Sequence, residues 1–103
     1  MAENRRSSTR HAVSIVTKLV VNDAPVDSTI MNLSLGGAQI SLTTRYPMGQ
    51  RGHVTFRVPT MEDPIAIGVT VRWADGKHVG IQFDGLRARD VWALNEYFKQ
   101  LQS

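Results

Sequence analysis

The residues best suited to bind a ligand begin with two arginines four positions apart near the start of the chain. Arg6 and Arg10 enclose Ser7-Ser8-Thr9, and a further arginine, Arg5, directly precedes them. An extended segment would span up to about 14 Å between the two positions, whereas a turn would bring both guanidinium groups to one ligand. A guanidinium group holds a phosphate in bidentate fashion or contacts O6 and N7 of guanine. The spacing favours a ligand with several anionic groups; a solvated basic arm is the alternative.

A second set of polar residues follows in the segment Asn32-Leu33-Ser34-Leu35-Gly36-Gly37, which has the form [DN]xSxxG. Asn32 can accept a hydrogen bond from a base, and Ser34 can donate one to a base or a phosphate. Gly37 permits a positive φ or a close approach of backbone. The alternative is structural, because Asn and Ser side chains also stabilise hairpin turns.

Residues for catalysis or metal binding do not form a pattern. His11, His53 and His78 are scattered singly, most carboxylates fall in expected turns, and no phosphate-binding glycine motif of the nucleotide-hydrolase or dinucleotide type occurs. We therefore expect neither an enzyme nor a metal site, and no cofactor.

The composition predicts one small domain. The chain has 103 residues, of which 42% are hydrophobic, and it has no cysteine, which excludes disulfides and thiolate chemistry. No apolar run is long enough to span a membrane, and the polar first ten residues lack the apolar middle of a secretory signal. A cytoplasmic protein is expected. Nine of the twelve basic residues are arginine, which suits phosphate and guanine better than lysine does.

The elements that must position these residues are predicted from hydrophobic periodicity. Alternation with a period of two indicates half-buried strands, and the even spacing of six such segments predicts an all-β antiparallel barrel or sandwich. Turns are expected at Asn22-Asp23-Ala24-Pro25 and at Asp75-Gly76. The predicted strands are His11 to Val21, Val26 to Leu33, Gly37 to Thr43, His53 to Val58, Ile65 to Trp73 and Val79 to Phe83.

A single C-terminal helix is expected over about residues 86–102, because the period there becomes helical. Its apolar stripe is predicted to consist of Val91, Leu94, Phe98 and Leu101. Trp92 falls away from that stripe, so we expect it to be at least partly exposed, as a contact for a protein partner or a second copy; a rotated helix that buries it is the alternative.

The two motifs together, in this order and on this all-β pattern, resemble the PilZ domain, a family of bacterial receptors for cyclic di-GMP. The resemblance covers the arm at residues 1–10 and the barrel with its C-terminal helix at residues 11–103. It implies a six-stranded PilZ-type β-barrel in which Arg6 and Arg10 wrap the dinucleotide. Asn32, Ser34 and Gly37 would hold a guanine, with Gly36 as a further candidate contact.

Two further positions take their meaning from the resemblance. In the PilZ family the residue just before the arginine motif tends to influence whether one ligand or a stacked pair is bound, and the resemblance assigns this position to Arg5. Trp73 is similar to an aromatic position sometimes found beside the nucleotide, although its phase matches the core residues of its strand, so we expect core packing.

The implied mechanism is a mobile arm that becomes ordered when cyclic di-GMP binds, which changes the surface that a partner protein meets. One rival is a PilZ-like adaptor that binds no nucleotide and acts through protein contacts. The other is a small basic barrel for single-stranded nucleic acid, which the low aromatic content of 7% disfavours.

Overall fold

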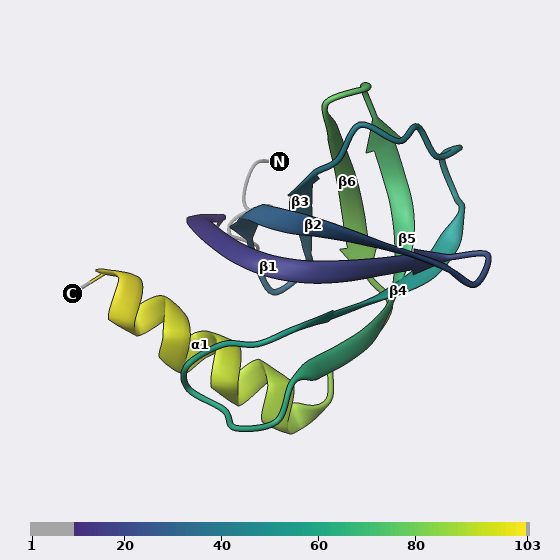
Figure 1. Cartoon of the computed structure of the whole chain (residues 1–103). Coiled ribbons are helices and arrows are strands. Elements are labelled where there is room, and N and C mark those ends of the chain that lie inside the picture. Colours follow the sequence, from purple (N-terminus) through teal and green to yellow (C-terminus); the bar gives the residue numbers. More distant parts are fainter. Residues whose placement is uncertain (1–9, 103) are drawn as a thin grey trace, which may run out of the picture.

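Six strands pair into a closed antiparallel barrel in the computed structural model, which describes residues 10–102 (Figure 1). A C-terminal helix lies below the barrel in this view. The predicted fold class, with six strands and one helix, is confirmed. The elements are β1 His11–Val21, β2 Ala24–Leu33, β3 Gly37–Ser41, β4 Arg51–Phe56, β5 Ile65–Ala74, β6 His78–Phe83 and α1 Ala88–Gln102.

The strand order around the barrel is β1-β2-β3-β6-β5-β4. Four of the six pairings join strands that follow each other in the chain, and the other two, β3 with β6 and β1 with β4, close the sheet. The β3–β6 pairing sets Gly37 opposite Gln82. It therefore brings the predicted glycine motif beside the second half of the chain.

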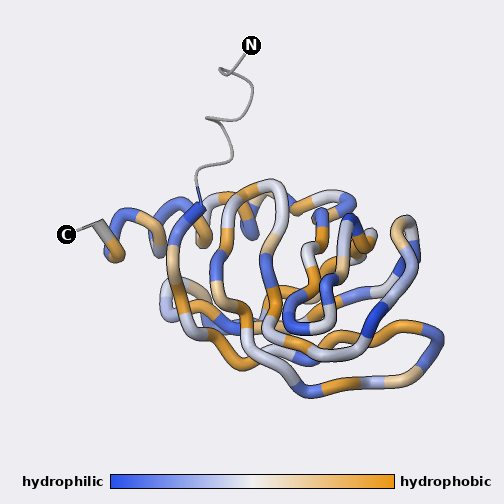
Figure 2. Tube along the Cα trace, turned by 90° about the horizontal axis from the view of Figure 1, so that it is seen from above, coloured by the Kyte–Doolittle hydropathy of each residue, from blue (hydrophilic) through white to orange (hydrophobic). Residues whose placement is uncertain are grey.

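Alternating side chains fill the interior of the barrel, as the period-two pattern predicts. Hydrophobic and hydrophilic residues alternate along the strands of the trace (Figure 2). Each large apolar side chain that is fully removed from water contributes about 1.5–3 kcal/mol to stability. The strand residues with no exposed surface are Leu19, Ile30, Leu33, Ile40, Val54, Ile65, Val69, Val71 and Val79.

Trp73 does not pack in the core, so that prediction is wrong. The pairing of β5 with β6 is regular up to Val71 and Ile81, but the register shifts before Trp73, which pairs with Gly80. The extra residue reverses the alternation, so Arg72 and Trp73 are both exposed. The indole is 40% exposed and covers Gly80, where a Cβ atom would overlap the ring.

The turns explain the shifted strand boundaries. Asn22 and Asp23 have φ values of 54° and 62°, as a tight two-residue hairpin turn requires, so Ala24 and Pro25 belong to β2 instead of the turn. The β5–β6 turn has a φ of 88° at Gly76. Backbone N–H groups of Lys77 and His78 donate to Asp75 there and lower the pKa of its carboxyl.

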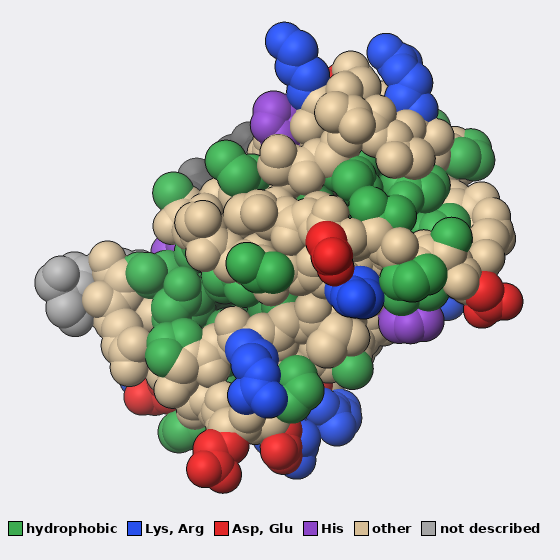
Figure 3. Space-filling model, viewed as in Figure 1, with side chains coloured by type: hydrophobic (Ala, Val, Ile, Leu, Met, Phe, Trp, Pro, Cys, Tyr) green, Lys and Arg blue, Asp and Glu red, His purple; other side chains and the backbone are tan. Residues whose placement is uncertain are grey.

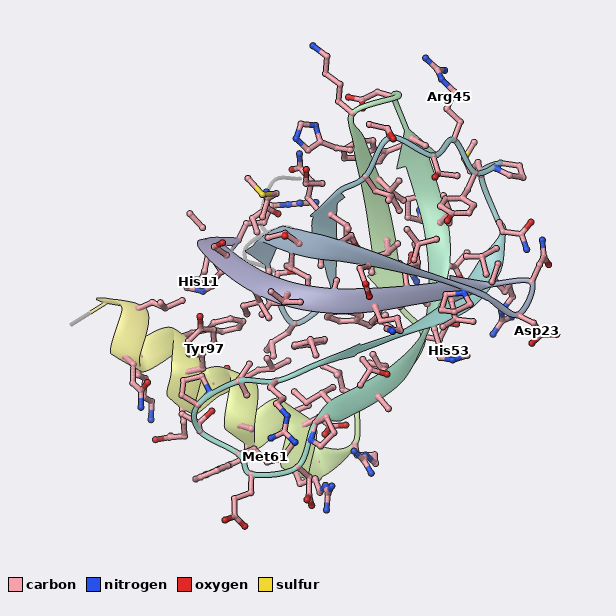
Figure 4. The ribbon with its side chains drawn as sticks, viewed as in Figure 1. His11, Asp23, Arg45, His53, Met61 and Tyr97 are labelled. Atoms are coloured by element: carbon pink, nitrogen blue, oxygen red, sulfur yellow. The ribbon has the colours of Figure 1, made fainter. Side chains whose placement is uncertain are left out.

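Helix α1 packs on the barrel through Ala93, Leu94 and Phe98, which are buried. The ring of Phe98 stacks on that of His11, with centroids 4.1 Å apart, and Figure 4 shows His11 and Tyr97 on the same side of β1. Leu101 is 41% exposed, so its place in the predicted stripe is wrong. The C-terminal end of α1 lies beyond the barrel strands in Figure 1, so its last turn has less barrel surface to pack against. Trp92 is 58% exposed, which confirms its predicted exposure.

Asp90 fixes the beginning of α1 although it is a buried carboxylate. It accepts hydrogen bonds from the backbone N–H of Arg87 at 3.2 Å and from Nε and a terminal nitrogen of the Arg87 guanidinium at 3.0 and 3.1 Å. The backbone bond is the one that an acidic residue in the first turn makes in a capping box. Burial acts to raise the pKa of Asp90, but the bonds from Arg87 outweigh burial, and the pKa is lowered.

Asp90→Asn is expected to reduce the free energy of unfolding by about 1–2 kcal/mol at neutral pH, because an amide replaces an ion-paired carboxylate. The carboxylate stabilises the fold fully above its unfolded-state pKa of about 3.9, and this stabilisation is lost as the pH falls through the lower folded-state pKa. Urea unfolding should show the difference from the parent narrowing below about pH 4. Asp27→Asn, which removes an exposed partner of Lys18, is the control; equal losses in both variants would contradict the assignment.

Candidate ligand-binding site

Ser34 holds the bend between β2 and β3. Its Oγ accepts hydrogen bonds from the backbone N–H groups of Gly36 at 3.1 Å and Gly37 at 3.2 Å, and its own N–H donates to the Gly37 carbonyl at 2.9 Å. The residue is buried. Ser34 therefore has the structural role that the sequence left open as an alternative, because its hydroxyl stabilises the turn from inside the bend.

The side chain of Asn32 forms its hydrogen bonds with other side chains and not with the backbone of the turn. Its Oδ1 accepts a hydrogen bond from a terminal nitrogen of Arg10 at 2.9 Å, and its Nδ2 donates to Oε1 of Gln39 at 2.7 Å. Asn32 and Gln39 are paired across β2 and β3. The last residue of the arginine motif is thus tied to the first residue of the glycine motif.

Gly37 is required by close approach of backbone. A Cβ atom at this position would overlap the carbonyl oxygen of Ile81, and the neighbouring Cα of Gln82 would be 3.2 Å away. Gly36 lies beside it, and its carbonyl accepts a hydrogen bond from the N–H of Phe83 at 2.9 Å. Both glycines therefore join the bend to β6.

A hollow of about 420 Å³ lies between Arg10, the bend and the outer face of β6. Three of the predicted site residues in the described part of the chain, Arg10, Ser34 and Gly37, line it, and so does Gly36. Asn32 does not line the hollow but holds Arg10 at its border. The remaining lining residues are Arg72, Ile81, Gln82 and Phe83.

The hollow has two guanidinium groups whose hydrogen-bond partners are neutral. Arg10 donates to the amide of Asn32, and Arg72 donates from a terminal nitrogen to Oε1 of Gln82 at 3.0 Å. Within residues 10–102 neither forms an ion pair. By contrast, the carboxylates of Asp84, Asp90 and Asp63 pair with the guanidinium groups of Arg51, Arg87 and Arg89. Uncompensated positive charge beside a hollow favours an anionic ligand.

Arg72 is a lining residue that the sequence analysis missed. Alternation along β5 does predict that it points outward, because Val71 before it points inward. The information that was missing is the strand order, because only the β3–β6 pairing brings β5 within two strands of Gly37.

The other predicted residues lie apart from the hollow or fall outside the described residues. Trp73 lies on the outer face over Gly80, which pairs with Gln39, but it does not line the hollow. Trp92 is on α1. Arg5 and Arg6 lie outside the described residues.

A second hollow, an apolar groove of about 810 Å³, differs in chemistry from the first. It lies where β1 and β4 diverge beyond Thr17 and Phe56, and Ile15, Val16 and Tyr97 contribute to its lining. Hydrophobic side chains gather between the strands and the helix on this face (Figure 3). None of the predicted ligand-binding residues lines this groove.

Among residues 10–102, no three His, Asp or Glu side chains are grouped so that they could hold a metal ion. In the same part of the chain, no helix has the length and apolar character needed to cross a membrane.

Comparisons with known proteins identify a family from the sequence and the same fold among solved structures. The sequence profile described as PilZ domain matches residues 4–100. No curated protein matches the chain. Among solved structures, the PilZ domain of CeSA from a cellulose-synthesizing bacterium superposes with a TM-score of 0.67 at 14% identity, over 90% of this chain and 98% of that one.

Two other similar structures are longer proteins. The inhibitor of motility MotI/DgrA of Bacillus subtilis has a TM-score of 0.78 at 21% identity, over 95% of this chain and 51% of its own. The PlzA protein of Borreliella burgdorferi, solved in complex with c-di-GMP, has a TM-score of 0.62 at 18% identity, over 95% and 37%. The chain thus spans about half of the length of MotI/DgrA and less of PlzA.

Gly37→Ala is expected to lower the free energy of unfolding by about 1–3 kcal/mol, because the added methyl group meets backbone that cannot rotate away. Chemical unfolding measures the change. Gly85→Ala is the matched control, because a Cβ there has no heavy atom within 4 Å. If the two variants unfold alike, the close approach of β3 to β6 at Gly37 is wrong.

Proposed function

Because the chain belongs to the PilZ domain family, we propose that it is a receptor for cyclic di-GMP. In this proposal Arg6 and Arg10 clamp the dinucleotide, and Asn32, Ser34 and Gly37 form the surface on which it rests, with Gly36 beside them. The observation that supports it most is the hydrogen bond between Arg10 and Asn32, which joins residues of the two motifs at one hollow.

The chemistry of the hollow suits a dinucleotide with two phosphodiester groups. Arg10 uses one N–H to bind Asn32, so most of its donors are free for a phosphate or the O6 and N7 edge of guanine. The glycine bend has no side chains beyond Cα at residues 36–37, so a flat base can approach its backbone closely.

Binding in this way would act as a switch on the residues ahead of β1. When Arg6 and Arg10 contact the same ligand, the arm is held against the hollow, and the surface beside β1 changes. The signal would then pass to a protein partner or to a second copy of the chain. Trp92, which is 58% exposed on α1, is the proposed contact residue for that step.

The exposure of Trp92 also favours a second candidate function, a PilZ adaptor that acts through protein contacts without nucleotide. The two functions differ in a single observable property, which is binding of cyclic di-GMP. No catalytic role is assigned in either.

Isothermal titration calorimetry with cyclic di-GMP tests the proposal directly. Arg10→Ala is expected to weaken binding about tenfold or more, because hydrogen bonds to a charged group are lost from the ligand and from Asn32. Arg57→Ala, which removes an arginine that donates to the carbonyl of Glu62, should bind as the parent does. A parent that does not bind, or an Arg10→Ala variant with unchanged affinity, would refute the proposal.

The number of ligands per chain tests the role of Arg5. We expect the parent to bind two molecules of cyclic di-GMP and Arg5→Ala to bind one, because a guanidinium group stacked on a second guanine would be lost. The molar ratio at equivalence in calorimetry, with sedimentation velocity to exclude dimer formation as its cause, gives the answer. An identical ratio for the two proteins would assign Arg5 no such role.

A further inference from the structure

Arg72 is a charged residue of the hollow that neither of the two motifs includes. It comes from β5, whereas Arg10 precedes β1, and along the side of the closed barrel that carries the glycine bend the strands β2, β3 and β6 lie between them. Both nevertheless line the same hollow. Neighbouring strands are about 4.8 Å apart, so the strand that carries Arg72 is about 10 Å from the strand that carries Gly37.

The side chain of Arg72 is held in place without being neutralised. Oε1 of Gln82 accepts a hydrogen bond from one terminal nitrogen at 3.0 Å, and Gln82 itself lies opposite Gly37 on β6. A guanidinium group has five N–H donors, so four remain for a ligand. A neutral amide orients the group and leaves its full positive charge facing the hollow.

The local backbone supports an exposed position for this residue. The register shift of β5 after Val71 leaves Arg72 and Trp73 both exposed. Bulges of this kind often re-aim side chains beside functional sites. The two guanidinium groups, Arg10 and Arg72, thus reach the hollow from different sides of the glycine bend.

We propose that Arg72 is a further ligand-binding residue, which contacts a phosphodiester group of the dinucleotide from the β5 side of the hollow. Gln82 is its positioning residue. The inference rests on the proposed function and extends it, because it assigns the two arginines to different parts of a doubly charged ligand. A phosphodiester is favoured because the guanidinium has no carboxylate partner among the described residues and can donate two parallel N–H hydrogen bonds to the oxygens of a phosphate.

Calorimetry with cyclic di-GMP on single variants tests the role of Arg72. Arg72→Gln is expected to weaken binding about tenfold, and Arg72→Lys less, because lysine keeps the charge and loses only the fork. Arg57→Gln is the control for an equal change in net charge, and thermal unfolding of each variant checks the fold. Equal affinities of Arg72→Gln and the parent would overturn the inference; equal losses in both Arg72 variants would overturn the phosphodiester contact.

The salt dependence of binding separates a charge contact from a structural effect. The affinity of Arg72→Gln should fall less steeply with added salt than that of the parent, because one charge pair is missing. In a double-mutant cycle, Gln82→Met should weaken binding in the parent and have no further effect in Arg72→Gln. Equal salt dependence, or additive losses, would contradict the assigned roles.

The outcomes distinguish this inference from the proposed function. A parent that does not bind cyclic di-GMP, or an unchanged Arg10→Ala variant, would remove the proposed function and the role of Arg72 together. Binding by the parent with loss only at Arg10 would keep the receptor and reject Arg72 alone.

Discussion

The site depends on one close contact, the approach of β3 to β6 at Gly37. Without a side chain at that position, the backbone of the bend lies against the carbonyl of Ile81, and the two halves of the chain form a single sheet surface. The same contact sets Gln82 beside the glycine motif and, through Gln82, the guanidinium of Arg72. A substitution that separates these strands would therefore affect the barrel and the hollow at once.

Polar contacts beside this β3–β6 pairing position the remaining residues of the site. Ser34 folds the bend from within, while Asn32 faces outward and holds Arg10. The two motif residues have distinct physical roles, because one determines the shape of the bend and the other determines where a cation lies. Sequence alone left both roles open for each residue, since serine and asparagine stabilise turns and also bind ligands.

The sequence predicted the strands and the helix well because a half-buried strand and an amphipathic helix have different periods. Prediction from the sequence failed where a register shift changes which side chains of a strand point inward. Trp73 has the spacing of a core residue, but the register shift before it turns its ring outward over Gly80. Arg72 was missed for a related reason, because pairing between β3 and β6, which are far apart in the chain, brings it near the glycine bend.

The central claim is that a dinucleotide occupies the hollow beside the glycine bend, and amide NMR spectra recorded during titration with cyclic di-GMP test it most directly. The account predicts saturable shifts for the backbone signals of Gly36, Gly37 and Gln82 and for the side-chain amide of Asn32, with the signal of Val16 in the apolar groove unchanged. Unmoved signals at the bend under saturating ligand, or shifts confined to the groove, would contradict it.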